Sequence, residues 1–161
     1  MLPRHTGAAV WIAGVGCSIL PDVDVIAFPF GVAYGDLLGH RGLTHSLLFA
    51  ALLSVAATLA LRGDGWRGHG LRIAFFLFIV TASHGLLDAC TNGGLGVAFF
   101  APFSAERFFF PARPIAVSPI GTAFFTARGW HVMQSEFAWV WLPALAVAAA
   151  AMVVRLRQHW R

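Results

Sequence analysis

The chain has 161 residues, of which 58% are hydrophobic and only 11% are charged. Soluble domains carry roughly a quarter charged residues, so this composition predicts a membrane protein and leaves room for one domain, residues 1–161. The formal net charge of +4 comes with eleven arginines and no lysine, and their scatter among apolar runs argues against nucleic-acid binding.

Four apolar segments approach the length of about 20 residues that a membrane-spanning helix needs. In chain order they are residues 7–20, extendable to residue 30, then residues 43–61, 71–87 and 137–154. Pro143 predicts a kink in the last segment. The sequence therefore predicts an all-α, polytopic membrane helix bundle of about four transmembrane helices plus short interfacial helices.

Arginine positions predict the orientation of these spans. With four crossings, one side of the membrane holds seven arginines: Arg4, Arg62, Arg67, Arg72, Arg155, Arg157 and Arg161. The opposite side holds six of the seven acidic residues. We therefore expect the arginine-rich side to be cytoplasmic.

The acidic pair Asp22 and Asp24 follows the first span in the stretch LPDVD. Side chains two residues apart diverge on an α-helix but point the same way in an extended turn. Pro21 favours such a break in the helix, and the two carboxylates could then converge on a cation. A solvated loop in which one aspartate caps a helix is the alternative.

His40 and His45 begin the second span in the stretch GHRGLTHS. Their spacing suits a turn followed by a helix start, in which Gly42 permits the turn and Thr44 caps the helix. Arg41 would face an acidic cluster or hold a substrate anion. The alternative is a polar collar at the membrane interface.

His84 and Asp88 stand four residues apart at the end of the third span, in SHGLLDACT. On a helix they share one face, where an imidazole and a carboxylate can bind one metal ion. A hydrogen bond between the two side chains at a helix end explains the spacing equally well.

With four crossings, these three motifs meet at one face of the membrane. Ionisable residues at membrane depth are costly and usually functional. Imidazole and carboxylate together suit zinc, manganese or iron. The absence of HExxH excludes the usual single-helix metalloprotease site. Six candidate ligands exceed the need of one catalytic zinc, so we expect either a two-metal site or some of the six outside the ligand set.

The connection between the third and fourth spans holds many phenylalanines together with Arg107 and Arg113. These arginines could bind phosphate or anchor the chain at the headgroup level. Cys17 and Cys90 are far apart in the sequence and are expected to be free thiols, with a disulfide as the alternative.

Three stretches of the chain together point to a known family: LPDVD, LGHRGLTHSL and SHGLLDACTNGGLGVAFFAPFSAERFFFP. They resemble the YdjM-like family of membrane-bound metal-dependent hydrolases, which is distantly similar to zinc-dependent phospholipase C and related nucleases. The resemblance implies a supporting shell of Arg41, Thr44 and Ser46. The metal residues that it implies are Asp22, Asp24, His40, His45, His84 and Asp88.

Members of this family commonly have another histidine well upstream of the PDxD element. Only His5 is available here, and it lies close to that element. We therefore expect either a chain that begins at an internal methionine or a site that lacks one ligand.

The sequence thus predicts a metal-dependent hydrolase at the outer face of the inner membrane, with a phosphoester or lipid-related substrate. The metal is expected to be zinc before manganese. Asp24 or Asp88 would accept a proton, and Arg41 would assist. The alternative is a metal-binding membrane protein or metal transporter without catalysis. Expected partners are the lipid bilayer and a lipid or phosphoester substrate, and not nucleic acid.

Overall fold

The computed structural model describes residues 7–61 and 68–159, and the regular secondary structure within them is helical. The chain divides into two compact units. The bundle unit comprises Met1–Cys90 and Gly94–Pro111, and the C-terminal unit comprises Thr91–Gly93 and Ala112–Arg161. The predicted all-α membrane bundle is confirmed, while the single domain stays a prediction.

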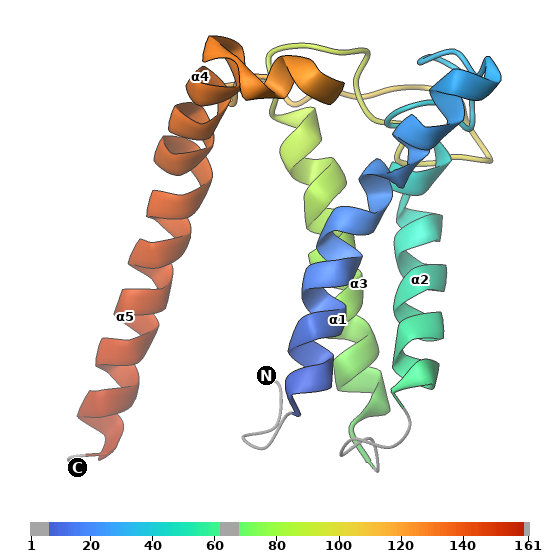
Figure 1. The fold of residues 1–161 in the computed structure, drawn as a ribbon. Helices are drawn as coiled ribbons and strands as arrows, with labels where there is room; N and C mark the ends of the chain where they lie inside the picture. Colours follow the sequence, from blue (N-terminus) through green and yellow to red (C-terminus); the bar gives the residue numbers. More distant parts are fainter. Residues whose placement is uncertain (1–6, 62–67, 160–161) are drawn as a thin grey trace. The chain divides into compact units, whose positions relative to one another are not determined.

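Three helices lie side by side in the bundle unit: α1 (Ala8–Ile19), α2 (Leu47–Ala60) and α3 (Gly70–Ala89) (Figure 1). Helix α3 packs against both of the others. The buried core joins α1 to α3 through Val10, Cys17, Ile73 and Leu77. Leu53 and Ala57 of α2 pack against this core, which therefore holds all three helices together.

Buried hydroxyl groups inside these helices find partners within their own helix. Thr58 donates to the carbonyl oxygen of Ser54 at 2.7 Å, and Thr81 donates to that of Leu77 at 2.8 Å. Such local bonds allow polar side chains in an apolar bundle without unsatisfied groups. The two cysteines, Cys17 and Cys90, are free thiols, as predicted.

Helix α1 continues directly into the 3-10 helix η1 (Leu20–Phe30). The extended turn expected around Asp22 and Asp24 is therefore wrong. Pro21 lies in the first turn of η1, where a missing N–H breaks no helical hydrogen bond, so the chain tightens instead of breaking. Gly31 ends η1 with a φ of 86°, a left-handed conformation that glycine adopts without strain.

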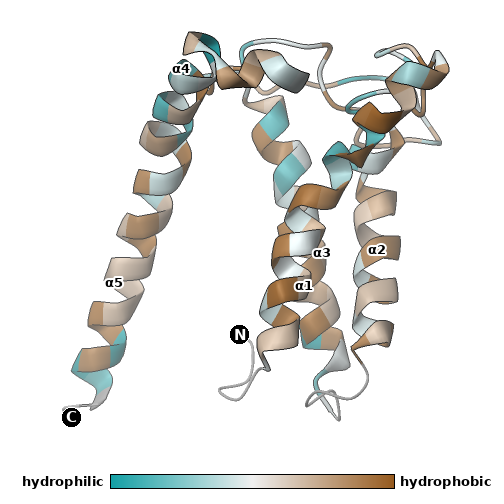
Figure 2. Ribbon diagram, viewed as in Figure 1, coloured by the Kyte–Doolittle hydropathy of each residue, from teal (hydrophilic) through white to brown (hydrophobic). Residues whose placement is uncertain are grey.

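Within the described residues, three helical segments are long and apolar enough to cross a membrane: Ala8–Phe30, Gly70–Ala89 and Ala127–Gln158. Helix α2 is apolar but has only 14 residues, a length of about 21 Å against a hydrocarbon core of about 30 Å. Large exposed side chains such as Ile12, Leu52 and Phe75 cover the outside of the bundle unit. Figure 2 shows hydrophilic residues gathered where η1 lies beside the end of α3.

One long helix dominates the C-terminal unit. It runs through α4 (Ala127–Glu136), the π-helical turn η4 (Phe137–Trp141) and α5 (Leu142–His159), and follows the short 3-10 helix η3 (Gly121–Phe125). Sequence analysis predicted a kink at Pro143. The structure places a π-turn directly before this residue, which accommodates a ring that would crowd a regular turn.

A loop that we call the cover segment, residues 94–108, closes one end of the bundle unit. Its two arms exchange backbone hydrogen bonds between Val97 and Phe108 at 2.9 and 3.0 Å. It also binds the chain before α2, because the Ala98 N–H donates to the Arg41 carbonyl and the Leu47 N–H donates to the Phe99 carbonyl, each at 3.0 Å. The start of α2 is thereby fixed to the rest of the unit.

Candidate metal centre

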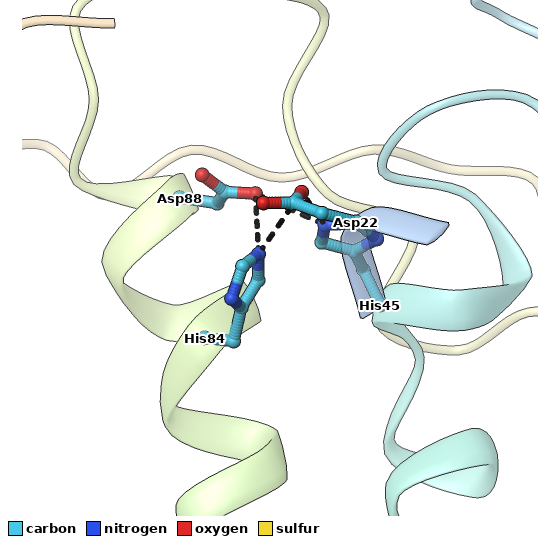
Figure 3. A group of neighbouring side chains, drawn as sticks. All are labelled: Asp22, His45, His84 and Asp88. Carbon is cyan, nitrogen blue, oxygen red and sulfur yellow. Dashed lines mark hydrogen bonds and ion pairs between the residues drawn. The ribbon is translucent and has the colours of Figure 1, made fainter. Parts of the chain in front are cut away.

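Four side chains from three elements point toward one another at the covered end of the bundle unit (Figure 3). Asp22 comes from η1, His45 from the 3-10 turn η2 (Leu43–His45), and His84 and Asp88 from the last turns of α3. One ligand atom from each lies within 4.8 Å of the others. The structure thus brings together the three motifs that the sequence singled out.

A glycine allows this close approach. A Cβ atom at Gly85 would lie 3.0 Å from the carbonyl oxygen of His45 and 3.5 Å from the side chains of Val97 and Phe99. Gly85 lies between His84 and Asp88 in the sequence, so α3 can pass directly beside η2 and the cover segment. A larger residue there would push the α3 ligands away from His45.

The hydrogen bonds of His84 fix which of its ring nitrogens carries the proton. Its Nδ1 lies 2.8 Å from the carbonyl oxygen of Ser18, which can only accept, so Nδ1–H is the donor. The Nε2 atom faces carboxylate oxygens, which also only accept, so it carries a proton in the protonated ring and a lone pair once that proton is lost. It lies 3.2 Å from Asp22 Oδ1 and 3.8 Å from Asp88 Oδ2.

The ring of His45 is also held through its Nδ1 atom. Thr44 donates its hydroxyl proton to Asp24 Oδ2 at 2.7 Å, so its oxygen accepts from His45 Nδ1 at 3.0 Å. The opposite nitrogen, Nε2, lies 3.2 Å from Asp88 Oδ2 and 3.5 Å from Asp22 Oδ1. This atom is buried and makes no hydrogen bond to any described residue.

Two imidazole Nε2 atoms and two carboxylates therefore face one another, an arrangement that needs positive charge, either as protons on the rings or as a cation among them. Burial alone would lower the pKa of His45, but the carboxylates of Asp22, Asp24 and Asp88 outweigh burial and raise the pKa to about 10. The cluster thus favours positive charge strongly. A divalent metal can replace the protons, since metal binding releases protons from its ligands.

Asp24 and His40 form a layer behind this cluster. Asp24 is 6% exposed, and its carboxylate accepts from His40 Nδ1 at 2.8 Å, from the Thr44 hydroxyl and from the Arg41 N–H at 3.2 Å. Asp24, His40 and His45 also approach closely enough to bind a metal, but these atoms already bond to one another. Asp24 is therefore suited to orienting His45, as carboxylates behind metal-bound histidines do.

Thr44 does not cap α2, and that prediction is wrong. The N-cap is Ser46, whose hydroxyl oxygen accepts from the Phe49 N–H at 3.0 Å. Thr44 lies inside η2, and its hydroxyl is held by Asp24 instead. Gly42 does permit the turn, because a Cβ atom there would lie 2.3 Å from the Leu37 carbonyl oxygen.

Arg41 faces the acidic cluster, one of the two roles expected for it. Its side chain is 3% exposed and donates to Asp88 Oδ1 at 2.9 Å and to the Asp88 carbonyl oxygen at 3.3 Å. Its φ of 62° is left-handed, a strained conformation for arginine that the surrounding bonds maintain. Arg41 thereby turns the other oxygen of Asp88, Oδ2, toward the histidines.

Arg107 has a structural role that the sequence did not predict. Its guanidinium donates to the carbonyl oxygens of Tyr34, Asp36, His40 and Gly96 at 3.0 to 3.4 Å. It ties the loop before η2 to the cover segment. A sequence does not show which backbone carbonyl groups a side chain will contact. Phosphate binding and headgroup anchoring were therefore the interpretations that the sequence offered for Arg107. His5, the one upstream histidine, lies outside the described residues.

Comparison with known proteins agrees with this picture. The family model described as YdjM inner membrane protein matches residues 1–160. The inner membrane protein YbcI of Escherichia coli (strain K12) is 45% identical over 135 residues, which cover 83% of this chain and 77% of YbcI. No solved structure matches the chain.

Replacing His45 or His84 with alanine should remove most of the bound metal, because each imidazole supplies one of few ligands. Metal content of the purified protein, measured by mass spectrometry, tests this. His131→Ala is the matched control, since His131 is exposed on α4. Full metal content in both His45→Ala and His84→Ala would rule out the shared site.

Asp24→Asn should weaken metal affinity by about 10- to 100-fold without lowering the stoichiometry at saturation, as expected for a residue behind the ligands. Competition with a chelator gives the affinity. A stoichiometry that stays near zero at saturating metal would instead make Asp24 a ligand.

Proposed function

This chain belongs to the YdjM family of inner membrane proteins and is a multi-pass membrane protein, and we propose that it is a metal-dependent hydrolase. The supporting observation is the pair of imidazole Nε2 atoms, of His45 and His84, aimed at the carboxylates of Asp22 and Asp88. The Nδ1 atoms of both rings are held by oxygen atoms, so each ring would direct an Nε2 lone pair at a metal that replaces the Nε2 proton.

The donor set fits zinc best. Zinc in a catalytic site takes two imidazoles and a carboxylate and leaves its fourth position to water, while manganese prefers more oxygen. The Nδ1–H groups of both histidines are held by oxygen atoms, which fixes the rings in the orientation that a metal requires. Of the six predicted metal residues, we propose the four clustered side chains as the metal centre, with Asp24 and His40 as supporting side chains.

A zinc ion held there would lower the pKa of a bound water and polarise a phosphoryl or carbonyl oxygen. Of the chain's own groups, Asp22 is best placed to take a proton from that water, because its side chain is half exposed and His45, His84 and Asp88 would suffice to hold the zinc. Asp24 is less suited because its oxygens are hydrogen-bonded in the interior, and Asp88 is held by Arg41. Arg41 keeps Asp88 in position and is too buried to reach a substrate freely.

A metal transporter is the alternative. Transporters place their sites near the bilayer midplane, between broken helices. Here the donors lie after α1, before α2 and in the last turns of α3, at one end of the helices. This position suits chemistry near the membrane surface.

We place this end of the bundle on the non-cytoplasmic face. The proposal needs α2 to cross the membrane together with the three longer segments. Part of the arginine-rich side that supports it, including Arg62 and Arg67, lies outside the described residues.

Metal-loaded protein should hydrolyse a phosphoester. Product release would be measured with bis(4-nitrophenyl) phosphate and with radiolabelled lipid extracted from bacterial inner membrane. We expect release with at least one of them, and its loss in His84→Ala but not in His131→Ala. Full zinc content without release from either would favour a non-catalytic metal-binding protein.

Cysteines introduced at His69 and Phe103 should label from opposite sides of the membrane. The background would carry Cys17→Ala and Cys90→Ser. With an impermeant maleimide on spheroplasts, Phe103→Cys should react at once and His69→Cys only after permeabilisation. The reverse order would put the site on the cytoplasmic face, and equal labelling would contradict four crossings.

A further inference from the structure

The four side chains of the ligand cluster differ in exposure. The Asp22 side chain is 50% exposed, whereas those of His84 and Asp88 are 19% and 18% exposed and that of His45 is fully buried. Asp22 is therefore the most accessible member of the cluster, where a molecule would first make contact.

The end of the bundle unit is closed. The cover segment lies over the histidine turn, where Ala98 and Phe99 bond to the chain on either side of His45. Val97, Ala98 and Ala101 are buried, so this segment is packed in place. Arg107 fixes it further by binding the carbonyl oxygens of His40 and Gly96. The cover segment thus shields His45, whose side chain is fully buried.

Exposed apolar side chains neighbour Asp22 and the α3 residues of the cluster in the sequence. Ile19 and Val23 flank Asp22 in the sequence and are 62% and 45% exposed. Leu87, between His84 and Asp88, is 41% exposed. All three belong to segments long and apolar enough to cross the membrane. We call Ile19, Val23 and Leu87 the apolar rim.

We infer that the substrate is a lipid phosphoester that reaches the site sideways from the bilayer. The phosphate lies at the ligand cluster beside Asp22, and the acyl chains lie along the apolar rim. A metal held by the cluster would attract the phosphate oxygens beside Asp22, while the rim would keep the chains in a hydrocarbon environment. This inference rests on the proposed function, since it needs a metal at the cluster.

The apolar rim also explains how a polar centre can lie within membrane-spanning segments. A half-exposed carboxylate facing hydrocarbon alone is costly. A bound phosphate headgroup supplies polar surroundings at that position, and the continuous apolar border on both helices matches the rest of the lipid. A water-soluble phosphoester would leave this border without a partner.

The test uses cobalt-substituted protein in nanodiscs, whose visible absorption reports oxygen ligands that reach the metal. Dioleoyl phosphatidate is added within the bilayer and sn-glycerol 3-phosphate in the water. We expect a spectral change with phosphatidate. Val23→Asn and Leu87→Asn should raise the phosphatidate concentration at half-change by about fivefold or more, because each places a polar group against an acyl chain.

Leu52→Asn is the matched control, since Leu52 is 62% exposed on α2, away from the rim. It should leave the response to phosphatidate unchanged, and all three variants should keep their cobalt. In the unmodified protein, dioctanoyl phosphatidate should act at lower concentration than glycerol 3-phosphate, which tests chain recognition without any substitution.

Equal potency of glycerol 3-phosphate and the lipids, with no effect of the rim variants, would overturn lateral access and leave the proposed hydrolase intact. Cobalt bound without a response to either probe would overturn the lipid phosphoester itself. Failure to bind cobalt at all would instead contradict the proposed function.

Discussion

The whole site depends on two hydrogen bonds that fix histidine protons away from its centre. His84 donates to the Ser18 carbonyl, and His45 donates to the Thr44 hydroxyl, which Asp24 holds. Each bond turns an Nε2 atom toward Asp22 and Asp88. The carboxylates around these rings favour positive charge, and they are also the reason why the pKa of His45 is raised. The fold brings α3 against η2 at Gly85, which places His84 and Asp88 beside His45.

Two features surround this cluster. Arg41 forms an ion pair with Asp88 in the interior, and the cover segment lies over the end of the bundle unit. The exposed side holds a single half-exposed carboxylate between apolar side chains. Buried charge of this kind costs stability unless it is paired. Here the charged groups of the cluster contact one another, and Asp22, which is half exposed, lies where we propose that a ligand approaches.

Much of this could be predicted from sequence, and the rest depends on contacts that a sequence does not display. The pairing of His84 with Asp88 follows from helical periodicity alone, and the meeting of three motifs follows from counting crossings. The conformation at Asp22 and Asp24 could not be predicted, because Pro21 fits the start of a 3-10 helix as well as a break. Thr44 and Ser46 both precede an apolar run, and only the position of Asp24 decides which one caps α2. We assign Asp24 and His40 a supporting role because of their hydrogen-bond partners, which a sequence does not display.

X-ray absorption at the zinc edge of the purified, zinc-loaded protein tests the central claim most directly. The account predicts two imidazole nitrogens and carboxylate oxygens at about 2.0–2.2 Å, without sulfur, and the loss of one imidazole in His84→Ala. A sulfur neighbour at about 2.3 Å, or a spectrum that His84→Ala leaves unchanged, would contradict it.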